Sequence, residues 1–238
     1  MKQLIISCCP KYGCNKKSPK VEGLLTEIKF LLCRYWSRVV ELINFYPAYS
    51  VYHKKKTITT LLNKIPYACG INEHIFDSLK TAAMSEKEQI NLNCVLIFDE
   101  MSLQPGLQFN KKRGCIDGFV DMGGEFRRRA LADHVLVFML WGIRRKWKQP
   151  LSFYFCESST CTSDLVKCIK DNIRAVRMAG FHVVGTICDQ GSTNRAAINY
   201  LLEETNELFF AGEENTYRGF LIDDIEVWFS LPSERHQK

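Results

Sequence analysis

The sequence lacks any apolar run long enough to cross a bilayer. No uninterrupted apolar stretch approaches the roughly 18 residues that a transmembrane helix needs. The short apolar stretch Leu4–Ile6 is followed by Cys8, Cys9 and Pro10, and not by the core and cleavage site of a signal peptide. We therefore expect a protein that is neither membrane-spanning nor secreted and that resides in the nucleus or the cytoplasm.

Internal repeats and low-complexity tracts are also absent, and no Gly-x-x-x-x-Gly-Lys loop is present to hold a nucleotide. Hydrophobic residues make up 46% and charged residues 24% of the 238 residues, which argues against global disorder. A chain of this length can form one substantial domain and an accessory segment. The net charge of +6 favours a polyanionic partner only weakly, because solvated lysines are common on any surface.

The cysteines do not suggest a disulfide framework. There are 11 of them, an odd number, and most stand singly within apolar runs, which favours free buried thiols. Cys9 and Cys14 have a spacing that could begin a zinc site. The nearest candidates for a second pair of ligands, Cys69 and His74, are spaced too widely, so we do not expect structural zinc.

The sequence pattern predicts two segments in the N-terminal part of the chain. Residues 1–20 include a basic stretch with proline and glycine and no periodicity, which is typical of an arm. Residues 21–90 form a helical accessory segment, with an amphipathic helix at 21–45 and two short helices within 57–89. The pattern leaves open whether this segment is a small DNA-binding module or a packing brace.

From residue 91 onward the pattern changes to short apolar runs alternating with amphipathic helices. The order of three or four strands, helix, strand and helix predicts an α/β fold with a mixed sheet flanked by helices. Pattern alone does not separate this layout from other α/β folds. The predicted strands lie at 94–98, 115–121, 135–143, 151–155 and 183–188, and the predicted helices at 163–179 and 192–204.

The helix at 163–179 has the clearest phase. Ser163 or Thr162 is expected to cap its start, and Gly180 to end it. One face is apolar and should lie on the sheet, whereas the opposite face is basic and should stay in water. The residues expected to be buried are Leu165, Val166, Ile169, Ile173 and Val176, and those expected to be exposed are Lys167, Lys170 and Arg174.

Two aspartates stand where predicted strands end. Asp99 follows the run 94–98, and Asp189 follows the run 183–188. If the two strands are parallel neighbours, both carboxylates lie at the edge where α/β sheets bind ligands, and a hard cation such as Mg²⁺ or Mn²⁺ could sit between them. Taken singly, each residue is more simply read as a cap on a turn or helix. Glu100 and Asp121 compete as alternative ligands.

Four segments within about residues 92–205 stand out, namely 98–102 (FDEMS), 118–123 (GFVDMG), 147–150 (WKQP) and 188–194 (CDQGSTN). In order and spacing they resemble motifs of P-element transposases and of the THAP-domain transposase-like proteins of animals. The resemblance implies an RNase H-like nuclease domain over residues 91–230. It further implies Mg²⁺- or Mn²⁺-dependent DNA cleavage and strand transfer in the nucleus, with Asp99 and Asp189 as catalytic, metal-binding residues.

The sequence also departs from the family pattern. The third acidic residue of the family, a glutamate, lies far downstream of an inserted GTP-binding domain, and neither is found here, so we do not expect GTP binding. Residues 231–238 diverge from the Asp-Pro-x-His segment of the relatives. We therefore hypothesise a truncated transposase core that is inactive alone. The alternative is a non-catalytic remnant that binds DNA or protein.

Two basic clusters are candidate DNA contacts. The first is Arg127, Arg128 and Arg129, and the second is the segment 144–148 with Arg144, Arg145 and Lys148, in which Trp147 could stack on a base. The competing interpretation is that the charges are solvated and that Trp147 packs in the core. The expected partner is DNA, and a homo-oligomer is left open.

Overall fold

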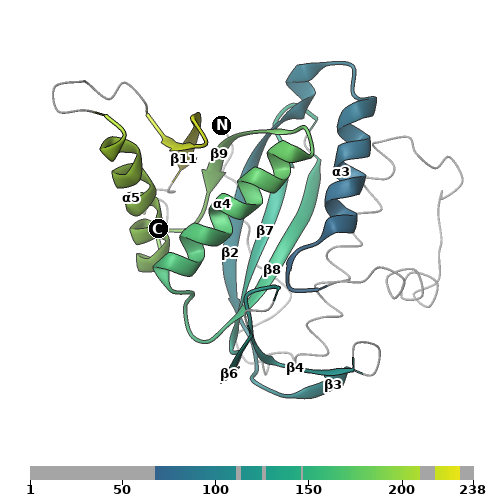
Figure 1. Cartoon of the computed structure of the whole chain (residues 1–238), viewed down its shortest axis with the longest axis vertical. Helices are drawn as coiled ribbons and strands as arrows, with labels where there is room; N and C mark the ends of the chain where they lie inside the picture. The colour runs from purple at the N-terminus through teal and green to yellow at the C-terminus, as the bar shows by residue number, and fades with distance from the viewer. Residues whose placement is uncertain (1–67, 111–113, 125–126, 146, 210–217, 231–238) are drawn as a thin grey trace, which may run out of the picture.

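The computed structural model describes residues 68–110, 114–124, 127–145, 147–209 and 218–230 (Figure 1). The predicted helix at 21–45, the helix expected before Pro66, the pair Cys9 and Cys14, and the tail 231–238 lie outside these ranges.

The described residues are built around one mixed sheet. Its strands lie in the order β10-β11-β9-β2-β7-β8-β5-β6, with β1 paired to β8, and β3 and β4 form a separate hairpin. The strands are β1 (Gly70–Ile71), β2 (Asn93–Ser102), β3 (Gln108–Asn110), β4 (Cys115–Asp117), β5 (Phe119–Asp121), β6 (Arg127–Leu131), β7 (His134–Gly142), β8 (Lys148–Cys156), β9 (His182–Ile187), β10 (Phe220–Ile222) and β11 (Ile225–Ser230).

The directions of the strands confirm the predicted fold class. β7 is antiparallel to both β2 and β8, so β2 and β8 run in the same direction. β9 is parallel to β2, and β11 is parallel to β9. The last residues of β2, β8, β9 and β11 therefore lie at one edge of the sheet, which we call the carboxyl edge. This is the edge at which open α/β sheets place ligands.

Two predicted strand boundaries were wrong. β2 does not end before Asp99 but continues to Ser102, because β7 pairs with it as far as Ser102 opposite His134. The run 115–121 is not one strand. It breaks at Gly118, which has φ of +111°, a conformation that favours glycine. A side chain there would also collide with the carbonyl oxygen of Gly106.

The helices α3 (Glu73–Ser85) and α4 (Thr162–Met178) lie across one face of the sheet, and α5 (Ser192–Glu207) lies beside α4 (Figure 1). A short 3₁₀ helix, η1 (Gln89–Leu92), precedes β2. Of the helices in the described ranges, none is long and apolar enough to cross a membrane.

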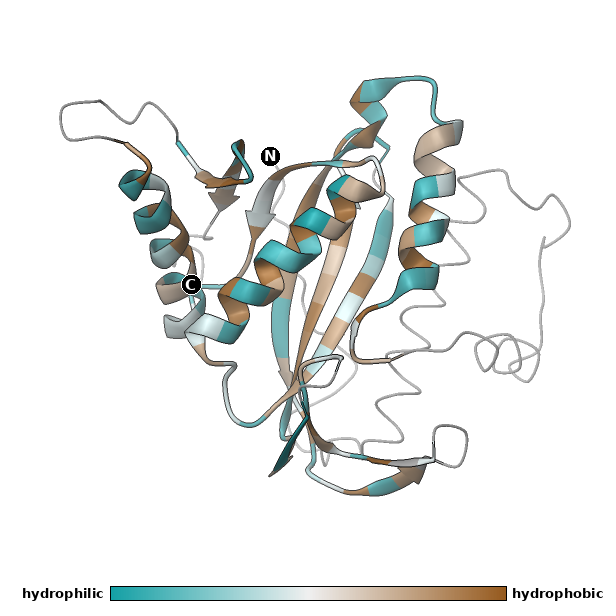
Figure 2. Ribbon diagram, in the orientation of Figure 1, coloured by the Kyte–Doolittle hydropathy of each residue, from teal (hydrophilic) through white to brown (hydrophobic). Residues whose placement is uncertain are grey.

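The phase of α4 is as predicted, with its hydrophobic side against the sheet (Figure 2). Lys167 and Arg174 are exposed, whereas Lys170 is half-buried because its Nζ forms an ion pair with Glu204. The helix ends before Gly180, whose φ is +92°. The expected cap was wrong, since the residue before the helix is Cys161 and no side chain caps the first turn. The buried residues include Leu165, Val166, Ile169, Ile173 and Val176.

The main core lies between this helical layer and the sheet. Leu96, Phe98 and Phe138 of the sheet pack there with α4, and Ile75 and Leu79 of α3 belong to the same cluster. The described part of the predicted accessory segment therefore packs on the sheet as a brace would. For residues before 68 the predicted domain boundary stays a prediction.

The core also holds a polar residue, at a position that helical periodicity places on the buried face but that the residue type would not suggest. Asn172 of α4 is fully buried, and its amide nitrogen donates to the hydroxyl of Tyr154 and to the carbonyl oxygen of Cys168. Its amide oxygen accepts a hydrogen bond from the hydroxyl of Ser152 at 2.7 Å. Because all of these hydrogen bonds are formed, Asn172 can fix the position of α4 on β8 without the penalty of an unpaired polar group.

The hairpin of β10 and β11 was not predicted. Its turn residues Asp223 and Asp224 both have positive φ, 51° and 61°, as two-residue hairpin turns require. Arg174 of α4 donates to both carboxylate oxygens of Asp223, at 2.8 and 2.9 Å. Arg177 donates to the carbonyl oxygen of Ile222. These contacts fix the hairpin against α4 and complete the sheet beyond β9.

Candidate active site

Asp99 lies in β2, and Asp189 lies just beyond the end of the neighbouring parallel strand β9. Ile97 of β2 pairs with Ile187 of β9, and each aspartate comes two residues after its isoleucine in the sequence. Because side chains alternate between the faces of a sheet, Asp99 lies on the face of Ile97. Cys188, between Ile187 and Asp189, is buried in the core on the helical face, and Asp189 is exposed. We call Asp99 and Asp189 the carboxylate pair.

Within the described residues, each carboxylate of the pair accepts hydrogen bonds through one of its two oxygens. Oδ1 of Asp99 accepts a hydrogen bond from the backbone N–H of Glu100 at 2.8 Å. Oδ1 of Asp189 accepts from the backbone N–H of Gly191 at 3.0 Å and from Nδ2 of Asn194. Within the described ranges, Oδ2 of neither residue receives a hydrogen bond. The pair thus presents two carboxylate oxygens to which no described residue donates a hydrogen bond.

The charges of the carboxylate pair affect the pKa values of neighbouring groups. The pKa of Asp99 is raised, first by burial against the protein and then by the charges of Asp189 and Glu100, although the N–H of Glu100 lowers it. Burial, together with the charges of Asp189 and Asp99, raises the pKa of the Cys188 thiol to about 12. Two like charges at one edge favour a bound cation, which would offset their repulsion.

The two alternative acids do not join the carboxylate pair. Glu100 is the next residue of β2 and belongs to the opposite face, where its Oε1 accepts from the backbone N–H of Thr160 at 2.8 Å. Asp121 is on β5, separated from β2 by β7 and β8. It is buried, and its Oδ2 lies 3.1 Å from Nε of Arg127. These placements do not favour either acid as a ligand, and their competition for the metal stays a prediction.

The donor set at the carboxyl edge therefore consists of two carboxylates. Across the part of the chain that the structure describes, no group of three or more His, Cys, Asp and Glu side chains could hold a metal ion. Carboxylate oxygens are the ligands that Mg²⁺ and Mn²⁺ prefer, and Mg²⁺ keeps several waters when it binds only one or two of them. The pair fits such a cation by its chemistry.

The first basic cluster is largely paired within the protein. Arg127 contacts the buried Asp121, and Nη2 of Arg128 lies 3.0 Å from Oδ2 of Asp164 at the start of α4. Arg129 is exposed, and among the described residues it has no recorded hydrogen bond or ion pair. Of the three arginines expected to contact DNA, only Arg129 presents an uncommitted charge.

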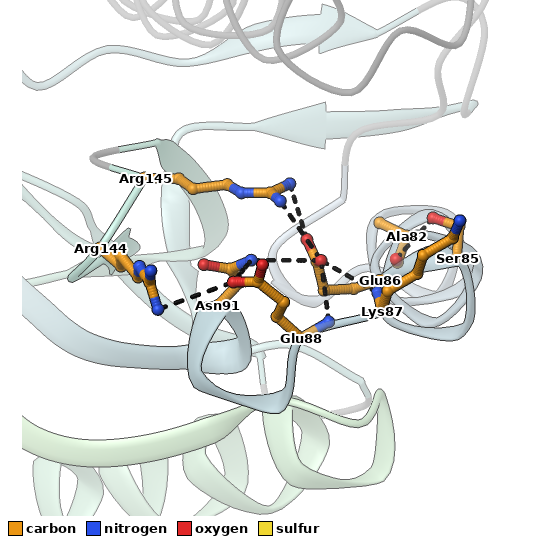
Figure 3. Close-up of polar contacts among 8 residues, drawn as sticks. All are labelled: Ala82, Ser85, Glu86, Lys87, Glu88, Asn91, Arg144 and Arg145. Carbon is orange, nitrogen blue, oxygen red and sulfur yellow. Dashed lines mark hydrogen bonds and ion pairs between the residues drawn. The ribbon is translucent and has the colours of Figure 1, made fainter.

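The second basic cluster is tied to the segment between α3 and β2 (Figure 3). Nη1 of Arg145 lies 2.7 Å from Oε2 of Glu86, and Nη1 of Arg144 lies 3.6 Å from Oε2 of Glu88. Oε1 of Glu86 also accepts from the side chain of Asn91 and from the backbone N–H of Glu88. These arginines join the turn after β7 to the end of α3, and they are not an open basic surface.

The aromatic residue of that cluster is a packing residue. The ring of Trp147 meets Phe181 edge-on at a centroid distance of 5.3 Å, and it packs against the main core. It also lies so close to Gly142 that a side chain at position 142 would collide with it. Lys148 places its Nζ 4.5 Å from the ring centre of Trp141. Trp147 is therefore not available to stack on a base in this conformation.

Comparison with known proteins decides the family. A family model described as the TNP-like, RNase H N-terminal domain matches residues 67–202. The chain belongs to this family. The matched region contains the carboxylate pair, α3, α4 and most of the sheet.

Two curated proteins are similar to this member of the TNP-like RNase H family. The transposable element P transposase of Drosophila melanogaster is 21% identical over 184 residues, which are 77% of this chain and 19% of that protein. The human DNA transposase THAP9 is 29% identical over 101 residues, 41% of this chain and 11% of that protein. The chain thus spans at most about a fifth of the length of these two relatives.

A solved structure supports the fold. The Drosophila P element transposase strand transfer complex contains a chain that superposes with a TM-score of 0.52 at 18% identity, over 92% of this chain and 42% of that chain. The RNase H-like fold expected from the four motifs is confirmed.

One residue of this site had not been singled out from the sequence. Asn194 is the third residue of α5, and its side chain donates a hydrogen bond to Asp189, which stands five positions earlier in the sequence. It stands at the end of the segment 188–194, one of the four motifs, but its residue type suggested no metal ligand. Local spacing could have indicated it, because the first turn of a helix lies beside the chain that enters it.

Proposed function

We propose that this chain carries two of the metal-binding carboxylates of a transposase catalytic core that cleaves and joins DNA. The observation that carries the proposal is the parallel pairing of β2 and β9, after which Asp99 and Asp189 follow, close enough for the charge of Asp189 to act on Asp99. Among the described residues, one oxygen of each has no donor. The family assignment supports the same chemistry, because the similar proteins are transposases.

In this proposal Asp99 and Asp189 hold Mg²⁺ or Mn²⁺ through their Oδ2 atoms. When bound, such an ion supplies Lewis acidity to a phosphodiester and lowers the pKa of bound water. The hydrogen bonds to Oδ1 fix the orientation of both side chains, so little conformational entropy is lost on binding. The partner is DNA in the nucleus, consistent with the net charge of +6.

The proposal includes a limit on activity. Two carboxylates supply two negative charges, so a pair of divalent ions would be incompletely neutralised and the second ion poorly placed. We expect the 1–238 chain to bind Mn²⁺ weakly, at about millimolar concentration, and to perform no strand transfer alone. Efficient cleavage or joining by this chain would contradict this limit.

Calorimetric titration of Mn²⁺ into the metal-free chain tests the proposal. Asp99→Ala and Asp189→Ala should each abolish measurable binding. The control Asp77→Ala removes an exposed acid of α3 and should bind as the wild type does. Unchanged Mn²⁺ binding in both Asp99→Ala and Asp189→Ala would refute a metal site at the carboxyl edge.

A second candidate is a non-catalytic remnant that binds DNA or protein through its surface. It is favoured by the donor set among the described residues, where no third His, Cys, Asp or Glu joins the two carboxylates. The two candidates differ in the same titration, because a remnant needs no cation. A wild-type chain that binds DNA fragments but shows no Mn²⁺ affinity would support the remnant.

A further inference from the structure

Asn194 is a buried amide directed at one oxygen of the carboxylate pair. Its residue is 7% exposed, and its Nδ2 donates to Oδ1 of Asp189. The backbone N–H of Gly191 donates to the same oxygen at 3.0 Å. Two donors on Oδ1 and none recorded on Oδ2 give the carboxylate a defined orientation.

The glycine before α5 leaves space for the hydrogen bond between Asn194 and Asp189. Gly191 is the residue before α5, and a Cβ atom there would lie 3.1 Å from Oδ1 of Asp189 and 3.6 Å from Nδ2 of Asn194. The first of these distances is tighter than most contacts of a Cβ atom, so a side chain at 191 would press on the hydrogen-bonded pair. Glycine leaves room for Asn194 to reach back over the turn to Asp189.

The chemistry of the donor matters as much as its position. An amide orients a carboxylate by hydrogen bonding but adds no positive charge. A lysine or arginine in its place would orient Asp189 and also neutralise it, which would weaken its attraction for a cation. The combination of a neutral donor on Oδ1 and a bare Oδ2 is the arrangement expected of a carboxylate prepared to bind metal through one oxygen.

We propose that Asn194 is a positioning residue that holds Asp189 by Oδ1 and so directs Oδ2 towards the edge shared with Asp99. This inference rests on the proposed function, because it assigns Asn194 a purpose in the binding of Mg²⁺ or Mn²⁺. A purely structural role, in which Asn194 only secures the start of α5, predicts lower stability with no change in metal affinity.

The test compares Mn²⁺ affinity in the wild-type 1–238 chain and in three variants. Asn194→Ala removes the amide, and Asn194→Leu removes it while keeping most of the side-chain volume. Asn199→Ala is the matched control, an exposed asparagine on the same helix. Loss of an outer contact to a ligand typically weakens metal affinity by about 10–100-fold. We expect both variants at position 194 to lose at least about tenfold and Asn199→Ala to bind as the wild type does.

The outcomes separate this inference from the proposed function. If the wild type binds Mn²⁺ and folded variants at position 194 bind it equally well, the role of Asn194 is refuted and the metal site stands. If the wild type shows no Mn²⁺ affinity, both fail together.

A measurement on the wild type covers the case in which the variants do not fold. Titration with diamagnetic Mg²⁺ should shift the side-chain amide resonances of Asn194 in step with binding, because the acceptor Oδ1 changes its charge distribution when Oδ2 binds the ion. The amide of Asn199 should not move. The proposal would be overturned if other resonances shifted as Mg²⁺ bound while the side-chain amide resonances of Asn194 stayed unchanged.

Discussion

The carboxylate pair and the two basic clusters differ in how the fold treats their charges. Asp99 and Asp189 are like charges at one edge, and each keeps an oxygen without a protein donor. By contrast, four of the arginines in the clusters contact carboxylates within the domain. The paired arginines are therefore read as part of the scaffold, and a functional role for the two acids stays a prediction.

Trp147 provides the largest expected effect in this comparison. If Trp147 is a packing residue, Trp147→Ala should lower the free energy of unfolding by about 3 kcal/mol, because a large ring is removed from the core without a replacement. DNA affinity should not change. Urea denaturation monitored by circular dichroism measures the loss, and Trp228→Ala is the control because Trp228 is 58% exposed. A stable Trp147→Ala variant with weakened DNA binding would restore the stacking interpretation.

A substitution at Asp121 tests whether this acid serves the structure or binds metal. Asp121→Ala leaves Arg127 without its buried partner, and we expect a loss of about 2 kcal/mol, less than for a fully buried pair because Arg127 is a third exposed. Mn²⁺ affinity in calorimetry should equal that of the wild type. If Asp121→Ala lost Mn²⁺ binding but kept its stability, Asp121 would belong with the carboxylate pair.

The arginines can be compared with one another by the salt dependence of DNA binding. Arg129→Ala should reduce the slope of log affinity against log salt by about one, because one phosphate contact is lost. Arg145→Ala should leave that slope unchanged and cause only a small loss of stability, since its partner is Glu86. Fluorescence anisotropy with a duplex at several salt concentrations measures both slopes. Equal slopes for the two variants would contradict the distinction.

The smallest effect concerns the ionisation of Asp99, which partial burial disfavours first and the charge of Asp189 second. The pKa of Asp99 is raised in the folded chain, so its ionisation disfavours folding as the pH rises above the unfolded value of about 3.9. In EDTA, the stability of Asp99→Asn relative to the wild type should therefore increase from pH 3 to pH 7. The gain should stay below about 1 kcal/mol, because Asp99 is exposed and solvent screens it. Thermal melts at both pH values measure it.

Sequence reasoning succeeded where one residue pattern had one physical cause. The spacing of Leu165, Ile169 and Ile173 gave the phase of α4, because an amphipathic helix has to bury its apolar side. The runs ending near Asp99 and Asp189 predicted two strands, and the condition that these be parallel neighbours is met by β2 and β9. The catalytic role of these aspartates stays a prediction.

It failed where tertiary partners decide the outcome. The extension of β2 past Asp99 depends on β7, which no local pattern reveals. Arg127–Arg129 begin β6, a charged edge strand that the local sequence did not indicate, and their role as DNA contacts stays a prediction. The three residues of β10 are too few for periodicity to detect. The contact of Asn194 with Asp189 required the geometry of the turn before α5.

The register of β2 has a consequence for the synthesis of the protein. Cys94 contacts the backbone of His182, 88 residues later, so the parallel side of β2 cannot pair until β9 has left the ribosome. At 5–20 residues per second, the delay is roughly 4–18 s. During that time an apolar strand has an open edge, which is a template for intermolecular pairing. Nascent chains of this family should therefore engage chaperones at β2, and fragments ending before β9 should aggregate.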